Sequence, residues 1–160
     1  MNRLAKLGVI ALALTATTTS VVYAQMKPED AIRARQSIMR VVALNFGPVA
    51  QMAQGKMPWN KEAFVANALR LESVWAMNPH RFFPAGSDKA VAGAKIASFT
   101  DTTPEAWSKG DDFKKAFDAN GQAIGKLAAA ARSGDEAAMK AAAGDVGKAC
   151  KGCHDDFRAK

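Results

Sequence analysis

The chain has 160 residues, with 22 lysines and arginines against 15 aspartates and glutamates, and a formal charge of +7 at neutral pH. This length predicts a single core. A hydrophobic content of 49% with 23% charged residues excludes a disordered chain, and two cysteines are too few for a disulfide scaffold. No apolar run reaches the roughly 18 residues that a membrane-spanning helix needs. Because the basic residues are scattered among acidic ones, nucleic-acid binding is not expected either.

Residues 1–24 have the features of a secretory signal peptide. Basic residues come first, an apolar stretch runs from Leu7 to Ala16, and Val22-Tyr23-Ala24 fits a small-residue cleavage site. An uncleaved amphipathic anchor is the alternative, but the segment is apolar all round rather than two-faced. Cleavage after Ala24 leaves residues 25–160 as one exported domain, which we expect in the periplasm.

The first helix of this domain is predicted to begin at Pro28. Proline suits the first helical turn, and the acidic Glu29 and Asp30 face the positive end of the helix dipole. Largely apolar positions then recur at spacings of three and four, which is typical of a helix-bundle seam: Ile32, Arg35, Met39, Val42, Phe46, Val49 and Ala53. The seam continues past Gly47-Pro48, so a kink rather than an end is predicted there.

The second helix is predicted to follow a turn at residues 55–58, with Asn60 as its N-cap. One face of it is apolar: Phe64, Ala68, Leu71 and Trp75. Asn78-Pro79 ends it. The connection over residues 79–103 is long for a compact domain, so we expect it to be functional, or partly helical around Ala90 to Ile96.

Two more helices complete the chain. Thr103-Pro104-Glu105 predicts the N-cap, N1 proline and first-turn acid of a third helix that ends at Ser133-Gly134, and Asp135 is the predicted cap of a fourth. Their apolar faces are Phe113, Phe117, Ile124, Leu127 and Ala131 in the third, and Met139, Ala142, Val146, Cys150, Cys153 and Phe157 in the fourth. Four amphipathic helices with mostly short turns predict an all-α, antiparallel four-helix bundle.

The most informative segment is Cys150-Lys151-Gly152-Cys153-His154, a C-x-x-C-H motif. On a helix, the two sulfurs and the imidazole emerge within about 100° of arc. This arrangement suits one covalently bound haem c, with thioether bonds to Cys150 and Cys153 and with His154 as the iron ligand. A redox-active thiol pair would need a thioredoxin-like βαβ context, and a structural zinc site would need two further ligands.

An exported four-helix chain with this motif near its C-terminus resembles the cytochrome c′ family of class II c-type cytochromes. The resemblance rests on four segments of the sequence: Lys27 to Gln36, Pro104 to Trp107, Gly144 to Gly147, and Cys150 to Arg158. It implies a five-coordinate, high-spin iron with histidine as the sole axial protein ligand.

The resemblance also implies roles for individual residues. Met39 takes the place of the apolar residue that closes the distal side of the haem, and Arg35 and Gln36 approach the haem propionates. Asp101 lies in the loop that reaches the haem edge, and Arg158 matches a basic residue beside the proximal imidazole. For Arg35 there is also a physical reason, because an arginine in an apolar seam is costly unless it is paired. The alternative is a side chain that snorkels to solvent.

Two residues are candidates for a sixth iron ligand. Related low-spin class II cytochromes use a methionine of the first helix, which is the position of Met39, although methionine is also an ordinary core residue. His80 stands where relatives usually carry an aromatic residue near the haem rim, and a loop histidine in solvent is its simpler interpretation. Phe83 and Phe113 are candidates for distal-pocket aromatics.

We therefore expect an exported haem protein that binds nitric oxide or carbon monoxide at the iron and exchanges electrons with a redox partner protein. The alternative is a low-spin, six-coordinate electron carrier. Peroxidase-like catalysis lacks a distal histidine, so no enzymatic activity is expected. Relatives pair through their first two helices, which implies a homodimer, with Ile38, Leu44 and Leu69 as candidates for the contact patch.

Overall fold

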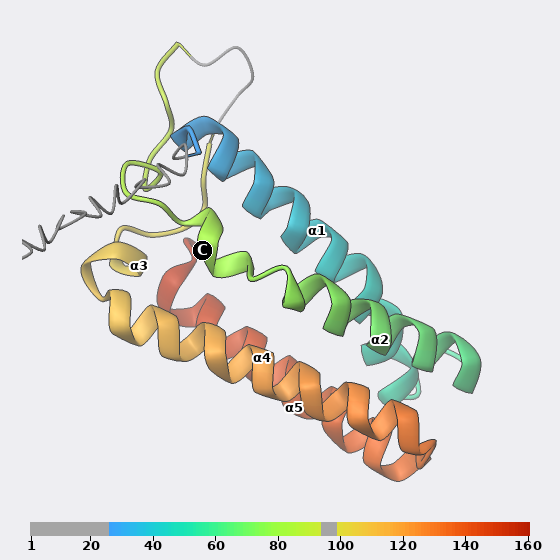
Figure 1. Ribbon diagram of the computed structural model, residues 1–160. Helices are drawn as coiled ribbons and strands as arrows, with labels where there is room; N and C mark the ends of the chain where they lie inside the picture. Colours follow the sequence, from blue (N-terminus) through green and yellow to red (C-terminus); the bar gives the residue numbers. More distant parts are fainter. Residues whose placement is uncertain (1–25, 94–98) are drawn as a thin grey trace, which may run out of the picture.

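The structure, a computed structural model, describes residues 26–93 and 99–160. The helices in these ranges are α1 (Pro28–Ala53), α2 (Lys61–Ala76), α3 (Glu105–Ser108), α4 (Gly110–Ser133) and α5 (Glu136–Phe157), with a 3-10 turn, η1, at Pro79–Phe82. The four long helices form a bundle in which α1 and α4 each pack against both α2 and α5 (Figure 1). The predicted four-helix bundle is confirmed. The predicted signal peptide, residues 1–24, lies outside the described residues.

Local chemistry sets the helix ends as the sequence predicts. The Asn60 side chain accepts a hydrogen bond from the Ala63 amide at 2.9 Å, which caps α2. The Asp135 side chain caps α5 in the same way, accepting from the Ala138 amide at 3.0 Å. Gly134 ends α4 with a left-handed φ of 73°, a conformation that glycine adopts without steric cost.

The predicted third helix is wrong in one respect, because it is two helices. Lys109, with φ −115° and ψ 46°, separates the single turn of α3 from α4, and Pro104 rather than Thr103 is the N-cap residue. The Trp107 indole donates to the carbonyls of Phe83 and Pro84 at 3.2 and 3.1 Å. These bonds hold α3 against the segment after η1, and the break at Lys109 lets α4 take its own direction along the bundle.

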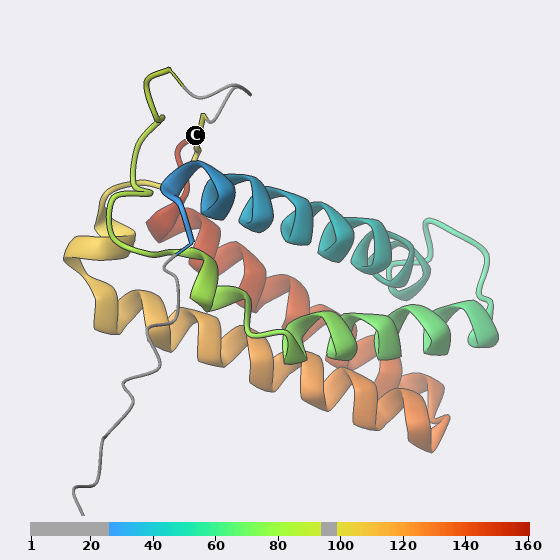
Figure 2. The ribbon, with the colours of Figure 1, turned by 45° about the horizontal axis from the view of Figure 1, so that its top comes forward.

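The long connection between α2 and α3 differs from its prediction in the part that the structure describes. It opens with η1, and residues 90–93 are not helical but lead into a turn at residues 92–93; residues 94–96 of the predicted helix lie outside the described residues. The end of the bundle that this connection covers holds both the start of α1 and the end of α5 (Figure 2). Segments far apart in the sequence therefore meet there.

The interior of the bundle divides into two apolar clusters. The larger one fills the middle and the α4–α5 turn end, and Phe64, Leu71, Leu127 and Met139 are among its fully buried side chains. The smaller one lies at the end covered by the connection and consists of Ala106, Phe113, Phe117 and Phe157, with partly buried neighbours around it. We call this second group the aromatic cluster.

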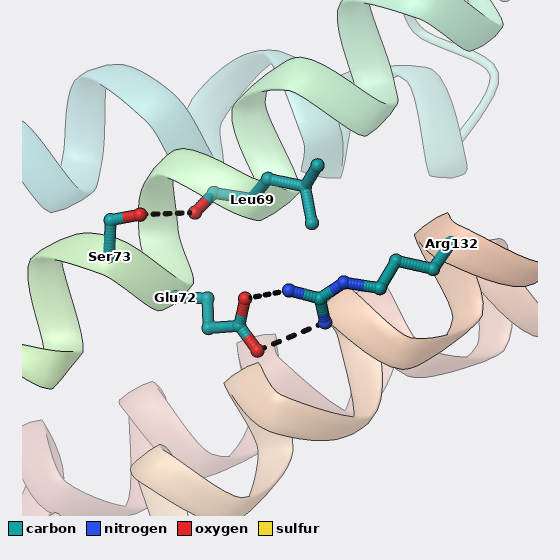
Figure 3. Close-up of polar contacts among 4 residues, drawn as sticks. All are labelled: Leu69, Glu72, Ser73 and Arg132. Atoms are coloured by element: carbon teal, nitrogen blue, oxygen red, sulfur yellow. Dashed lines mark hydrogen bonds and ion pairs between the residues drawn. The ribbon is translucent and has the colours of Figure 1, made fainter.

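One ion pair joins α2 to α4 across the surface of the bundle. The Arg132 guanidinium donates to both carboxylate oxygens of Glu72 (Figure 3), with a distance of 3.1 Å for the Nη1–Oε1 contact. The hydrogen bonds from Arg132 lower the pKa of the Glu72 carboxyl below its usual value. This bidentate geometry fixes the relative position of the two helices more closely than a single contact does.

No helix within residues 26–93 and 99–160 is both long and apolar enough to cross a membrane.

Candidate functional site

The C-x-x-C-H motif occupies the last two turns of α5. Cys150 packs at the edge of the larger cluster and Cys153 at the edge of the aromatic cluster, both half-buried, while the imidazole of His154 is exposed. Desolvation by neighbouring protein atoms lowers the pKa of His154, and the Arg158 guanidinium lowers it further. A neutral imidazole is the form that ligates iron.

The two thiols do not have the properties of a redox-active pair. Burial raises the pKa of Cys150, and burial together with the nearby Cys150 and Asp156 raises the pKa of Cys153 to about 11. Reactive cysteines instead have a lowered pKa, because the thiolate is the nucleophile. Within the described residues no group of three or more His, Cys, Asp or Glu side chains is arranged to hold a metal ion, so a zinc site has no support there either.

Cys153 faces the aromatic cluster, and so does Met39. Met39 on α1 and Phe83 after η1 pack against the same buried rings as Cys153. The rings form a continuous wall, with Phe83 and Phe113 edge to face at 4.9 Å between centroids and Phe113 and Phe157 likewise at 5.0 Å. The structure therefore brings together three residues singled out in the sequence, Met39, Phe83 and Phe113, on an apolar surface beside the attachment motif.

Arg35 is buried, with only 3% of its surface exposed. Its guanidinium donates to Ser87 Oγ at 2.9 Å, to the Ser87 carbonyl at 2.6 Å and to Thr100 Oγ1 at 2.7 Å. It also lies over the rings of Phe83 and Trp107. The alternative of a snorkelling side chain is therefore wrong, because these loop residues enclose the head group.

The charge of Arg35 is not neutralised by a carboxylate at ion-pair distance within the described residues. Desolvation lowers the pKa of the guanidinium to about 10, with a smaller opposing effect from Asp88. A buried cation held only by uncharged oxygens is costly. Its surroundings thus fit an anionic group, and the haem propionate implied by the resemblance is one. Gln36, next along α1, donates from Nε2 to the Phe99 carbonyl at 2.6 Å.

Asp101 and Arg158, which the sequence suggested separately, lie together. Arg158 Nη2 is 3.5 Å from Asp101 Oδ2, and both side chains are more than half exposed. The backbone fixes this placement, because the Ala159 amide donates to the Asp101 carbonyl at 2.7 Å and the Thr103 amide donates to the Phe157 carbonyl at 3.0 Å. The C-terminal residues are therefore tied to the segment before α3, immediately after His154.

His80 is half-buried, so the prediction of a loop histidine in solvent is wrong. Its ring packs against Phe113 and Phe117 at centroid distances of 5.7 and 5.5 Å. His80 thus contacts the aromatic cluster from η1, whereas Met39 contacts the cluster from α1.

Sequence reasoning missed several residues of this region. Ser87 and Thr100 accept hydrogen bonds from Arg35, although they lie 52 and 65 residues away from it in the sequence. No local sequence pattern identifies them as its partners. Asn120 is also buried: its Nδ2 donates to the carbonyls of Ala116 and Ala149, and its Oδ1 has no partner among the described residues. Asn120 comes three residues after Phe117 on the apolar face of the third predicted helix. Helical periodicity could therefore have predicted that it is buried.

Comparison with known proteins agrees with this geometry. The family model described as Cytochrome C' matches residues 30–158. A cytochrome c′ from Rubrivivax gelatinosus is 42% identical over 134 residues, covering 84% of this chain and 98% of that protein. The crystal structure of cytochrome c′ from the same organism has a TM-score of 0.74 at 41% identity, covering 83% of this chain and 98% of that one.

Two further solved structures come from Alcaligenes xylosoxidans cytochrome c prime, each 37% identical with a TM-score of 0.70 and covering 84% of this chain and 98% of the other. One is the nitric oxide complex of a leucine-to-isoleucine variant, and the other is a leucine-to-glycine variant with bound carbon monoxide. The match extends over nearly the whole bundle, including the C-x-x-C-H motif at the end of α5. This chain belongs to the cytochrome c′ family.

Proposed function

We propose that the protein is a periplasmic, gas-binding c-type haem protein with a five-coordinate, high-spin iron. The observation that carries this proposal is the shared apolar surface of Met39, Phe83 and Cys153 against the aromatic cluster. An apolar distal side favours small uncharged diatomic gases, because anions and water lose their hydration there without a replacement. The nitric oxide and carbon monoxide complexes of the Alcaligenes relative support the same ligands here.

Different residues of the chain would bind different parts of one haem c. Cys150 and Cys153 would form the thioether bonds, and the imidazole of His154 would bind the iron. The bound haem supplies an iron that coordinates the gas. Arg35 and Gln36 lie near the start of α1, where their side chains hold the connection, and they would pair with the haem propionates. Asp101 pairs with Arg158, whose charge acts on the imidazole of His154, and the guanidinium would be the nearby donor for a ligand bound on the His154 side of the iron.

Residues 1–24 act in this proposal as a signal peptide that is cleaved after Ala24 during export. The protein has no enzymatic activity and exchanges electrons with a redox partner protein. Intact mass spectrometry of the secreted protein tests the first part, with an expected N-terminus at Gln25 and one covalent haem for each chain. A mass that retains residues 1–24, or that carries no haem, contradicts it.

Absorption spectra distinguish the proposed coordination from its alternative, a low-spin electron carrier in which a sixth side chain binds the iron. We expect a high-spin spectrum in the ferric and ferrous states that shifts on adding nitric oxide or carbon monoxide. The variants Met39→Leu and His80→Phe are the matched tests, because each removes one candidate ligand atom and keeps the apolar volume. Both variants should remain high-spin. A low-spin spectrum that resists the gases, and turns high-spin in one variant, identifies the ligand and favours electron transfer.

A further inference from the structure

A cavity of about 500 Å³ opens between α4 and the end of α2 with η1, separate from the α5 residues of the attachment motif. Its lining comes from two stretches of chain: Trp75, Asn78, Pro79 and His80 on one side, and Phe117, Asp118, Gly121 and Gln122 on the other. This volume lies within the range of about 300–1,000 Å³ that is usual for small-molecule sites.

Three aromatic side chains, those of Trp75, His80 and Phe117, line this cavity beside non-aromatic and polar residues. The Trp75 indole stacks on the Phe117 ring at 5.5 Å between centroids and an interplanar angle of 27°, and His80 meets the edge of the same ring. Gly121 makes the arrangement possible, because a Cβ atom there would lie only 2.9 Å from the indole nitrogen of Trp75. The next glycine along α4, Gly125, has open space around it. Thus only the first of these two glycines shapes the cavity.

The polar groups of the cavity are available to a ligand. The indole N–H of Trp75 has no hydrogen-bond partner within residues 26–93 and 99–160, and neither has the imidazole of His80. The Asp118 carboxylate stands at the rim, where it also pairs with Lys114 at 2.7 Å. The cavity therefore offers a fixed donor on an aromatic wall, together with an imidazole and a carboxylate that accept hydrogen bonds.

We propose that this cavity binds a planar aromatic ligand of the quinone–hydroquinone class. A flat ring fits beside the stacked Trp75 and Phe117 rings. A ring carbonyl accepts the hydrogen bond that the Trp75 N–H otherwise lacks, and a ring hydroxyl donates to His80 or to Asp118. An aliphatic ligand leaves the indole donor unpaired. Phe117 belongs both to this cavity and to the aromatic cluster, so the ligand binds next to the surface on which Cys153 packs.

Equilibrium dialysis of the haem-loaded protein with 2-methyl-1,4-naphthoquinone tests the proposal, and 2-methylnaphthalene serves as the ligand without carbonyls. We expect one saturable site for each chain and binding of the hydrocarbon weaker by about fivefold, the value of one hydrogen bond. Trp75→Phe should weaken binding of the quinone by a similar factor and leave the hydrocarbon unchanged. Absence of saturable binding, or equal affinities for the two ligands, overturns the proposal.

Two glycine variants test whether the quinone binds in this cavity. Gly121→Ala displaces the indole that lines the cavity and should reduce quinone affinity at least tenfold, whereas Gly125→Ala, one turn later on α4, should leave it unchanged. Equal binding by both variants means that the quinone sits elsewhere, including the haem pocket, and overturns the assignment. Should Gly121→Ala fail to fold, Trp75→Phe remains decisive. The dialysis uses no gas and does not depend on the spin state, so its failure is distinct from a failure of the proposed gas binding.

Discussion

Arg35 is the residue whose environment departs most from what its sequence neighbours suggest, because it places a charge inside an apolar seam. Its three hydrogen bonds tie α1 to residues 87 and 100 of the connection. We expect Arg35→Met to lower the free energy of unfolding by about 3 kcal/mol, because three oxygens lose a charged donor. Urea unfolding of the haem-loaded protein measures this loss.

Arg33 provides the matched control on the same helix. It pairs with Asp30 at a half-exposed position, so Arg33→Met should cost less than about 1 kcal/mol. Equal losses for the two variants contradict a special role for the buried guanidinium.

Asn120 is a second buried polar residue, and within the part of the chain that the structure describes only one of the two polar atoms of its side-chain amide is hydrogen-bonded. Its Nδ2 has two carbonyl partners and its Oδ1 has none among the described residues. We expect Asn120→Leu to be neutral or stabilising, since it removes an unsatisfied acceptor and both carbonyls lie within helices. Asn120→Asp should lower the free energy of unfolding by about 3 kcal/mol, because it buries a charge. A larger loss for leucine than for aspartate in urea unfolding would count against this account.

At the scale of whole helices, the Glu72–Arg132 pair gives the contact between α2 and α4 a dependence on pH. Hydrogen bonds from Arg132 lower the pKa of Glu72 in the folded protein below its usual value of 4.5. The stabilisation is therefore present above the unfolded-state pKa and is lost as the pH falls through the lower folded-state pKa. Glu72→Gln should lower stability at pH 7, and the difference from the original protein should shrink towards pH 3.

A double-mutant cycle checks that this pH dependence belongs to the pair. In an Arg132→Gln background, Glu72→Gln should have little further effect on the urea midpoint at pH 7, because the partner is already absent. An unchanged effect in that background assigns the loss to another contact of Glu72.

At the scale of the whole molecule, an apolar patch of α1 is exposed on the surface of the bundle. Leu44 is 69% exposed and Val41 42% exposed, whereas Ile38, which the sequence placed in the same patch, is buried within the chain and cannot contribute to it. Leu69 of α2 is half-buried. We propose that Leu44 and Val41 form the centre of a homodimer contact between the first two helices of each copy.

Sedimentation velocity tests this assembly. We expect the original protein to sediment as a dimer and Leu44→Lys to sediment as a monomer, because a lysine in an apolar contact loses its hydration. Ala129→Lys, at an exposed position on α4, is the control and should remain dimeric. Identical sedimentation of all three proteins removes this face of α1 from the interface.

The sequence by itself determined the features that depend on residues close together in the chain. Helical periodicity indicated the four long helices, because each buries one stripe of side chains against the others. The caps at Asn60 and Asp135 needed only a side chain three residues from an amide. The C-x-x-C-H motif likewise places both sulfurs and the imidazole on one helix face without help from the rest of the fold.

Only the tertiary structure decided which distant residues meet. Ser87 and Thr100 reach Arg35 from a connection that has no periodicity, and Asp101 meets Arg158 because backbone hydrogen bonds tie the two segments together. The break at Lys109 has the same kind of cause, since α3 is held by Trp107 contacts with the residues after η1. Such contacts depend on how the helices pack in three dimensions. A pattern confined to a few neighbouring residues therefore cannot predict them.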